Sequence, residues 1–266
     1  MDFNERTSFA MDISRKAGKR ILEIQDSELH IKNKDEDSHA AVDIVTIADT
    51  ESEKVIFSAL EKLFPDDGFI GEEGTNKASK NGYVWVVDPL DGTMNFSCQL
   101  PIYGVSVGYM YNSKPYGGAI YMPKLDDMYV AESTKGAYLN NKKINVSDNS
   151  EIKKSRLSIG SLSKKASDTA WFNNTIAQIN AENAVFYNFY CVIMSMTGLA
   201  SGKFDGNIIK GPALWDICAG AIIVEEAGGK LVKFDGSPID YKQIENHELL
   251  ATNGTLDLKK LVLSLV

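Results

Sequence analysis

The sequence predicts a mixed fold, with an α+β first half and an α/β second half. Three observations support this prediction: an apolar stripe with helical spacing near the N-terminus, several β-rich stretches in the middle, and an alternation of strand and helix patterns after Asn149. A length of 266 residues allows one large domain or two joined halves. We therefore expect two subdomains that share an interface, 1–149 and 150–266.

The N-terminal region predicts two helices. Apolar residues at positions 10, 13, 17, 21 and 24 are three or four residues apart, which predicts an amphipathic opening helix. The polar stretch Asp26–Ala41 shows no sustained period, and we expect a mobile loop there. A second helix is predicted over about Thr46–Leu63, because apolar residues recur on one side and Pro65 follows it.

The middle of the chain predicts a largely antiparallel sheet. Short stretches rich in β-branched and aromatic residues are separated by Gly, Pro, Asn and Asp. The predicted strands are Phe69–Gly71, Tyr83–Val87, Tyr103–Met110, Tyr116–Tyr121 and Met128–Ala131.

Strand and helix patterns alternate in the second half, as in α/β proteins. The predicted strands are Arg156–Ile159, Val185–Phe189, Phe204–Ile208, Lys230–Phe234 and Glu248–Ala251. The predicted helices lie near Thr169–Asn180, Ile193–Ser201 and Trp215–Glu226, with a last helix at the C-terminal end.

Composition narrows the class of protein. The formal net charge of −8 disfavours a nucleic acid as partner, because an acidic surface repels a phosphate backbone. The longest apolar run, Ile217–Val224, is too short to span a membrane. The first twenty residues contain no signal-peptide core, and the three cysteines are far apart. We therefore expect a cytoplasmic protein.

The densest chemical signal is the stretch WVVDPLDGT, residues 85–93. A buried strand ends in Asp88, and Asp91 follows three residues later. Gly92 allows close approach of the backbone to a ligand, and a helical turn beginning at Thr93 would make the amides of Gly92 and Thr93 an anion seat. Two carboxylates beside an anion seat need a cation between them, and oxygen-only ligands suit Mg²⁺.

Two further acidic sites strengthen this interpretation. Glu72 and Glu73 follow a short apolar stretch, and Asp216 lies in the first turn of a predicted helix. Each site has a structural alternative: Asp88 and Asp91 could cap backbone amides in a tight turn, and Asp216 could simply interact favourably with the helix dipole. Acids at three separate element ends are nevertheless what a metal cage built from distant segments requires.

Asp49 has two possible roles. The spacing of Thr46 and Asp49 fits a capping box at the start of the second helix, and spacing alone favours that structural role. In the functional alternative, Asp49 is a base that orients a water molecule, with the hydroxyl of Thr93 as its partner.

With these segments in hand, the chain resembles the inositol monophosphatase family of Mg²⁺-dependent, lithium-sensitive phosphatases. The motifs occur in the family order along nearly the whole chain, and their combination is specific. They are Asp43–Asp49 (DIVTIAD), Phe69–Glu73 (FIGEE), Trp85–Phe96 (WVVDPLDGTMNF), Trp215–Gly220 (WDICAG) and Glu226–Gly229 (EAGG), with weaker matches at Gly118–Pro123 and Lys135–Asn140.

The resemblance implies a layered αβαβα sandwich, a homodimer and hydrolysis of a small phosphate monoester by metal-activated water. It implies that Glu72, Asp88 and the carbonyl of Leu90 hold one Mg²⁺. Asp88, Asp91 and Asp216 would hold a second ion, and Glu72 would share a looser third. Asp49 and Thr93 would position the water, and the amides of Gly92 and Thr93 would hold the phosphate. Residues 1–149 would then carry most of the metal site, and residues 150–266 would add Asp216 and the substrate pocket.

The chain departs from the family pattern where the substrate pocket is expected. Stretch 207–213 lacks the acid that orients a polyol hydroxyl in many members, and 190–192 is bulkier than usual. Inositol phosphate therefore has an alternative, a nucleotide such as NADP or 3′-phosphoadenosine 5′-phosphate between Tyr187, Phe189 and Tyr190. A lysine that precedes the first motif in the family could be Lys32 or Lys34. A non-catalytic regulatory protein that keeps the fold is a further alternative, although the acid set is intact.

Overall fold

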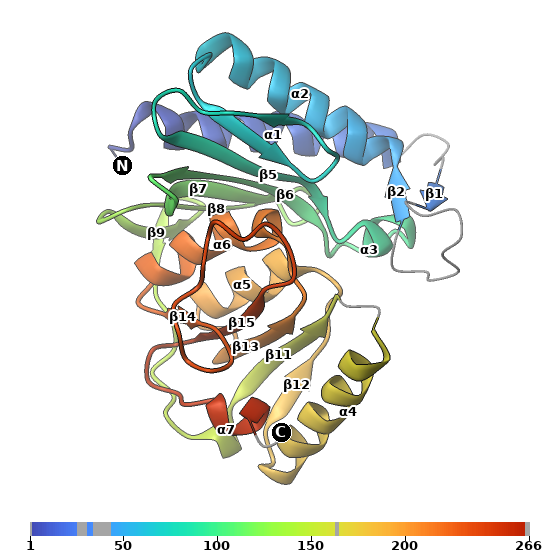
Figure 1. Ribbon diagram of the computed structural model, residues 1–266, viewed down its shortest axis with the longest axis vertical. Helices are drawn as coiled ribbons and strands as arrows, with labels where there is room; N and C mark the ends of the chain where they lie inside the picture. The colour runs from blue at the N-terminus through green and yellow to red at the C-terminus, as the bar shows by residue number, and fades with distance from the viewer. Residues whose placement is uncertain (1, 26–30, 34–43, 163–164, 264–266) are drawn as a thin grey trace.

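The computed structural model describes residues 2–25, 31–33, 44–162 and 165–263. Five layers follow one another in the order αβαβα (Figure 1). Helices α1 (Glu5–Gln25) and α2 (Ile47–Leu63) cover one face of a large sheet. Helices α5 (Val192–Ala200) and α6 (Leu214–Glu226) lie between the two sheets, and α4 (Ala166–Ala181) covers the outer face of the second sheet. The predicted layered sandwich is confirmed.

The large sheet has eight strands in the order β10-β9-β8-β7-β6-β5-β3-β4. Strands β3 and β5 run parallel and all other neighbouring pairs are antiparallel, so the prediction of a largely antiparallel sheet is confirmed. The strands are β3 (Gly68–Gly71), β4 (Asn76–Lys77), β5 (Tyr83–Asp91), β6 (Gly104–Tyr111), β7 (Lys114–Met122), β8 (Asp127–Glu132), β9 (Gly136–Leu139) and β10 (Lys142–Ile144).

The second sheet has five strands in the order β12-β11-β13-β15-β14. The predicted strands are all found, but three of them do not cover the whole predicted range. The third begins and ends two residues later than expected, the second ends at Tyr187 rather than at Phe189, and the fourth ends at Val232 rather than at Phe234. The strands are β11 (Arg156–Ser161), β12 (Val185–Tyr187), β13 (Gly206–Lys210), β14 (Lys230–Val232) and β15 (Glu248–Thr252). A 3-10 turn at Ile152–Lys154 precedes this sheet, and α7 (Lys259–Leu263) is the last helix.

One expectation for the N-terminal half is wrong. Stretch 26–41 was expected to be loop throughout, but Ile31–Asn33 forms β1, which pairs with β2 (Ile44–Thr46). Three residues are too few to show a strand period, and the pairing partner is distant in the sequence. The rest of that stretch, Lys34 included, lies outside the described residues, as do the side chains of Lys32 and Thr46.

The apolar stripe of α1 is buried against the large sheet, as its spacing predicts. The helix comes so close to β7 that a Cβ at Gly18 would lie 2.6 Å from the ring of Tyr121. At the start of the helix, Asn4 Oδ1 accepts the amide of Thr7, which satisfies one of the unpaired N–H groups of the first turn. Packing against β7 and capping of the first turn together fix the position of α1 on the large sheet.

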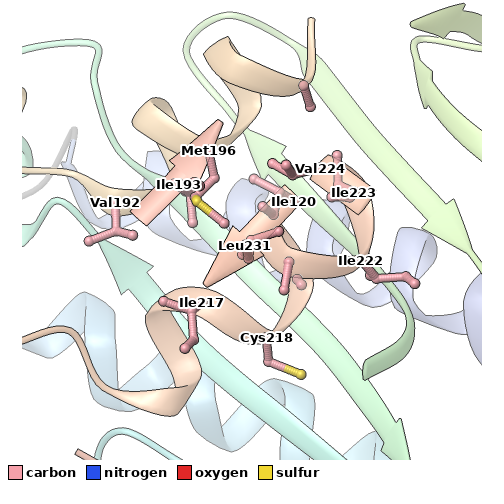
Figure 2. Close-up of a cluster of buried hydrophobic side chains, with 14 of the residues drawn as sticks. Ile120, Val192, Ile193, Met196, Ile217, Cys218, Ile222, Ile223, Val224 and Leu231 are labelled. Atoms are coloured by element: carbon pink, nitrogen blue, oxygen red, sulfur yellow. The ribbon is translucent and has the colours of Figure 1, made fainter. Parts of the chain in front are cut away.

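The largest apolar cluster fills the space between the two sheets. Figure 2 shows side chains of α5 and α6 meeting Ile120 of β7 and Leu231 of β14. This central layer is buried on both faces, which explains why its helices are apolar nearly all round. None of the described helices has the length and apolar character needed to span a bilayer.

Candidate active site

Strand β5 brings two of the predicted acids to one edge of the large sheet. Asp88 pairs with Ser106 of β6, and the register shifts before Asp91 pairs with Gly104. Within this irregular turn, the amide of Leu90 donates to Asp88 Oδ1 at 3.0 Å. Both carboxylates are buried. Because the pairing is interrupted, the side chain of Asp91 does not follow the regular alternation of side-chain directions along the strand.

Gly92 ends the turn and begins α3 (Thr93–Ser97), so the expected helical turn is present. Its φ of 89° lies in the left-handed region, and a Cβ there would be 2.7 Å from the carbonyl oxygen of Ile102. Both constraints require glycine at this position.

Thr93 connects Asp49 to the turn of β5. Its Oγ1 lies 3.1 Å from Asp49 Oδ1 and 3.0 Å from the carbonyl oxygen of Leu90. Asp49 is in the first turn of α2 and is fully buried. The structure thus brings Asp49, Thr93 and Leu90 together, although the first residue is more than forty positions from the others.

Glu72 reaches the same edge from β3. Because β3 and β5 are parallel, their carboxyl ends lie side by side. Glu72 is the first residue after β3, its amide donates to the carbonyl of Val87 at 3.2 Å, and its carboxyl group is hydrogen-bonded to that of Asp88. Two carboxyl groups in such contact need a proton or a cation between them.

Asp91 and Asp216 lie where the large sheet meets the helices of the central layer. Asp91 Oδ2 accepts the amide of Ile193 at 2.6 Å, in the first turn of α5. Asp216 is in the first turn of α6, and its Oδ2 accepts the amide of Ala213 at 2.6 Å. The first helical turn favours a negative charge, which lowers the cost of burying both acids.

The acids strongly perturb one another. Burial raises the pKa of Asp88 well above its usual value, and the negative charges of Glu72, Asp91 and Asp216 raise it further. Burial also raises the pKa of Asp91 to about 7, against the opposing effect of the Ile193 amide. A buried carboxyl group whose pKa is raised both by burial and by three neighbouring acids is a strong indication of a functional site.

A profile of the inositol monophosphatase family matches residues 2–265 of the chain. The chain belongs to the inositol monophosphatase family. Inositol monophosphatase 2 of Solanum lycopersicum is 34% identical over 263 residues, with 95% of each chain covered. The fructose-1,6-bisphosphatase/inositol-1-monophosphatase of Aquifex aeolicus (strain VF5) is 33% identical over 217 residues, covering 82% of this chain and 81% of that protein.

A comparison of the fold with solved structures agrees with the match to the family. The crystal structure of the extragenic suppressor protein suhB from Bartonella henselae matches with a TM-score of 0.88 and 25% identity, over 97% of this chain and 98% of that one. The inositol monophosphatase family is a phosphatase family, so this member is a phosphoric monoester hydrolase.

The acid set of this inositol monophosphatase family member fits a hard divalent cation in its chemistry, since every donor is an oxygen. Among the residues that the structure describes, no three acidic, histidine or cysteine side chains already converge as a group that could hold a metal ion. Asp91 and Asp216 each direct an oxygen to a backbone amide instead.

A small, shallow pocket that is partly open to solvent lies near Asp91. Its lining includes Phe189, Tyr190 and Cys191, and the thiol of Cys191 is 3.6 Å from Asp91 Oδ2. Tyr187 does not line this pocket. Its ring stacks on that of Phe189, with centroids 5.6 Å apart and an interplanar angle of 7°.

Sequence reasoning assigned no role to two buried residues next to the site. Asn95 Nδ2 donates to the carbonyl oxygens of Ile102 and Phe189, both at 2.8 Å, and so joins α3 to the wall of the pocket. Glu53 follows Asp49 by four residues on α2 and contacts the loop that carries Glu72. The four-residue spacing was the available signal for Glu53, because it puts both acids on one helix face.

Proposed function

We propose that this protein hydrolyses a small phosphate monoester with Mg²⁺ as cofactor. The observation that supports this most is the group of acids around Asp88, which meets the Asp49–Thr93 pair at the end of β5. A group of buried carboxylates of this density is compatible with folding when divalent cations neutralise it. The family membership supports the same reaction class.

The proposed ligands come from four elements. Glu72, Asp88 and the carbonyl of Leu90 would hold one Mg²⁺. Asp88, Asp91 and Asp216 would hold a second, and a looser third would be shared at Glu72. Two ions at such a site stabilise the attacking and leaving oxygens of a phosphoryl transfer.

The protein's own groups would orient the reactants. The hydroxyl of Thr93 has one hydrogen and two acceptors in reach, Asp49 Oδ1 and the carbonyl of Leu90. When it donates its hydrogen bond to Asp49, its oxygen would accept a hydrogen bond from the attacking water, and a proton lost by that water would pass to Thr93 as the Thr93 proton passes to Asp49. Asp49 would then be the base that receives the proton, while the amides of Gly92 and Thr93 would hold the phosphate.

The names of the relatives favour a polyol or sugar phosphate as substrate, since they refer to inositol monophosphate and fructose 1,6-bisphosphate. A nucleotide such as NADP or 3′-phosphoadenosine 5′-phosphate is the second candidate. The aromatic side chains of Phe189 and Tyr190 in the pocket favour it, because a base can stack on them. We also propose inhibition by Li⁺, a cytoplasmic location and a homodimer.

The test is phosphate release from four compounds, each with and without Mg²⁺: myo-inositol 1-phosphate, fructose 1,6-bisphosphate, NADP and 3′-phosphoadenosine 5′-phosphate. We expect release only with Mg²⁺, and the order of kcat/KM identifies the substrate class. Release that is equally fast in excess chelator would contradict the metal assignment. Absence of release from all four compounds, together with absence of Mg²⁺ binding, would favour the non-catalytic alternative.

A further inference from the structure

Glu53 is a buried acid that the reaction proposed above does not use. It lies on α2 with only 2% of its surface exposed. Its Oε2 accepts the amide of Glu73 at 2.9 Å, and its Oε1 accepts the amide of Thr75 at 3.2 Å. Both carboxylate oxygens are therefore engaged by backbone donors of one loop, which makes Glu53 a support for that loop rather than a metal ligand.

The supported loop is the connection between β3 and β4, residues 72–75. Its first residue, Glu72, donates its amide to Val87 of the neighbouring strand at 3.2 Å. The loop closes on itself through the amide of Gly71, which donates to the carbonyl of Thr75 at 2.9 Å. Glu53 thus holds the part of the loop that lies directly after Glu72, and β5 holds Glu72 itself.

Gly71 makes this contact possible. A Cβ at position 71 would meet the carboxylate of Glu53 and would lie 2.7 Å from the ring of Phe69. The glycine at the end of β3 and the acid on α2 therefore fit together, since the helix can approach the strand end closely only where no side chain intervenes.

Glu53 and Asp49 are four residues apart on α2, so they lie on the same face one turn from each other. One helix therefore carries the acid that contacts Thr93 and the acid that supports the Glu72 loop. We propose that Glu53 is a positioning residue, which holds loop 72–75 so that the carboxylate of Glu72 stays against Asp88. This inference rests on the proposed function, in which Glu72 is a metal ligand.

The substitution Glu53→Gln tests the inference at nearly constant shape. A glutamine keeps one acceptor oxygen but places an NH₂ group opposite the second amide, so one of the two hydrogen bonds is lost. We expect the dissociation constant for Mg²⁺, measured by isothermal titration calorimetry on the protein without substrate, to rise about 10- to 100-fold. We expect faster hydrogen exchange at the amides of Glu73 and Thr75, and a kcat close to normal at saturating Mg²⁺.

Glu226→Gln is the matched control. Glu226 also accepts two backbone amides with its carboxylate, those of Thr134 and Gly136, both at 2.7 Å. It lies at the far end of α6 from Asp216, roughly 15 Å along the helix axis. This variant loses the same kind of hydrogen bond, and we expect its Mg²⁺ affinity to stay normal.

Unchanged Mg²⁺ affinity in a folded Glu53→Gln protein would overturn the inference, and so would equal loss of affinity in both variants. If the wild-type protein binds no Mg²⁺, the proposed function fails, and hydrogen exchange alone judges the support of the loop. If Glu53→Gln does not fold, hydrogen exchange is measured in the wild-type protein instead. We expect the amides of Glu73 and Thr75 to be protected, and rapid exchange at both would overturn the inference.

Discussion

At the scale of single residues, the hydroxyl of Thr93 is the contact between the proposed base and the metal turn. It is within hydrogen-bonding distance of Asp49 and of the Leu90 carbonyl. Its removal therefore breaks the hydrogen-bonded link between Asp49 and the turn of β5 without changing the charge of the site. We expect Thr93→Val to lower kcat by about 10²- to 10⁴-fold, because water would lose its orienting partner. Steady-state phosphate release at saturating Mg²⁺ measures this.

Thr93→Ser is the control, since serine keeps the hydroxyl and loses only a methyl group. We expect it to retain most of the activity. A Thr93→Val enzyme with near-normal kcat would show that the Asp49–Thr93 contact has a structural role only.

The sequence indicated the main residues of the candidate site because their motifs combine rare residues at short spacing, as in Asp88, Asp91 and Gly92. It could not indicate the role of Asn95 or Glu53 in the same way. The partners of both side chains are backbone groups of segments distant in the sequence, and a backbone acceptor or donor leaves no residue pattern. The spacing of Glu53 from Asp49 places both acids on one helix face but does not indicate the partners of Glu53. The metal roles stay predictions until binding is measured.

At the scale of elements, Asn95 joins α3 to the pocket wall. Asn95→Ala removes the donor from two carbonyl groups, those of Ile102 and Phe189. We expect the free energy of unfolding to fall by about 1–2 kcal/mol. We also expect KM for the preferred substrate to rise about 3- to 10-fold, with a smaller change in kcat, because the wall loses its anchor.

Asn253→Ala separates this effect from general destabilisation. Asn253 is also buried, and its Nδ2 donates to Ser147 Oγ and to the carbonyl of Asn149. Its Oδ1 also accepts the amides of Thr255 and Leu256, so we expect at least as large a destabilisation, with an unchanged KM. Equal KM values in the Asn95→Ala and wild-type enzymes would mean that the wall near Phe189 does not contact the substrate.

The long elements could be predicted from the sequence, whereas several of the shortest strands could not. The stripe of α1 and the apolar run of β5 extend over enough residues to show a period. Strands β1, β4, β9 and β10 have two to four residues each, and pairing with a neighbour, rather than their own composition, makes them strands. For the same reason the ends of β12 and β13 differ from the prediction.

At the scale of the whole molecule, we propose that residues 1–149 and 150–266 are two subdomains that share one site. Asp91 of the large sheet accepts the amide of Ile193, and the hydroxyl of Ser106 lies 3.4 Å from the carbonyl of Trp215. The acids therefore come from both parts of the chain, and neither part contains the complete set.

A second whole-molecule feature is the ion pair of Arg6 and Asp67, which ties α1 to the large sheet. Both oxygens of Asp67 accept the guanidinium, and Asn81 and Trp85 donate to them as well. Burial opposes ionisation of Asp67, but these donors outweigh it and hold its pKa below the usual value. The ionised form is therefore favoured in the folded state.

We expect Asp67→Asn to lower the free energy of unfolding by about 1–3 kcal/mol at pH 7. Because the pKa of Asp67 is lower in the folded than in the unfolded state, ionised Asp67 stabilises the fold at pH values above the unfolded-state pKa. This stabilisation is lost as the pH falls below about 4. Urea unfolding of both proteins across this pH range measures it. A stability difference that stays constant with pH would contradict the assignment of the ionised carboxylate.

The most direct test of the account is the number of Mg²⁺ ions bound per chain in the wild-type protein and in Asp88→Asn, measured by equilibrium dialysis. Asp88 is the only acid assigned to both principal ions, and asparagine keeps its shape while removing its charge. We expect at least two ions for the wild-type protein and a large loss of binding in the variant. Equal binding by the two proteins, or the absence of Mg²⁺ binding by the wild-type protein at millimolar concentration, would contradict it.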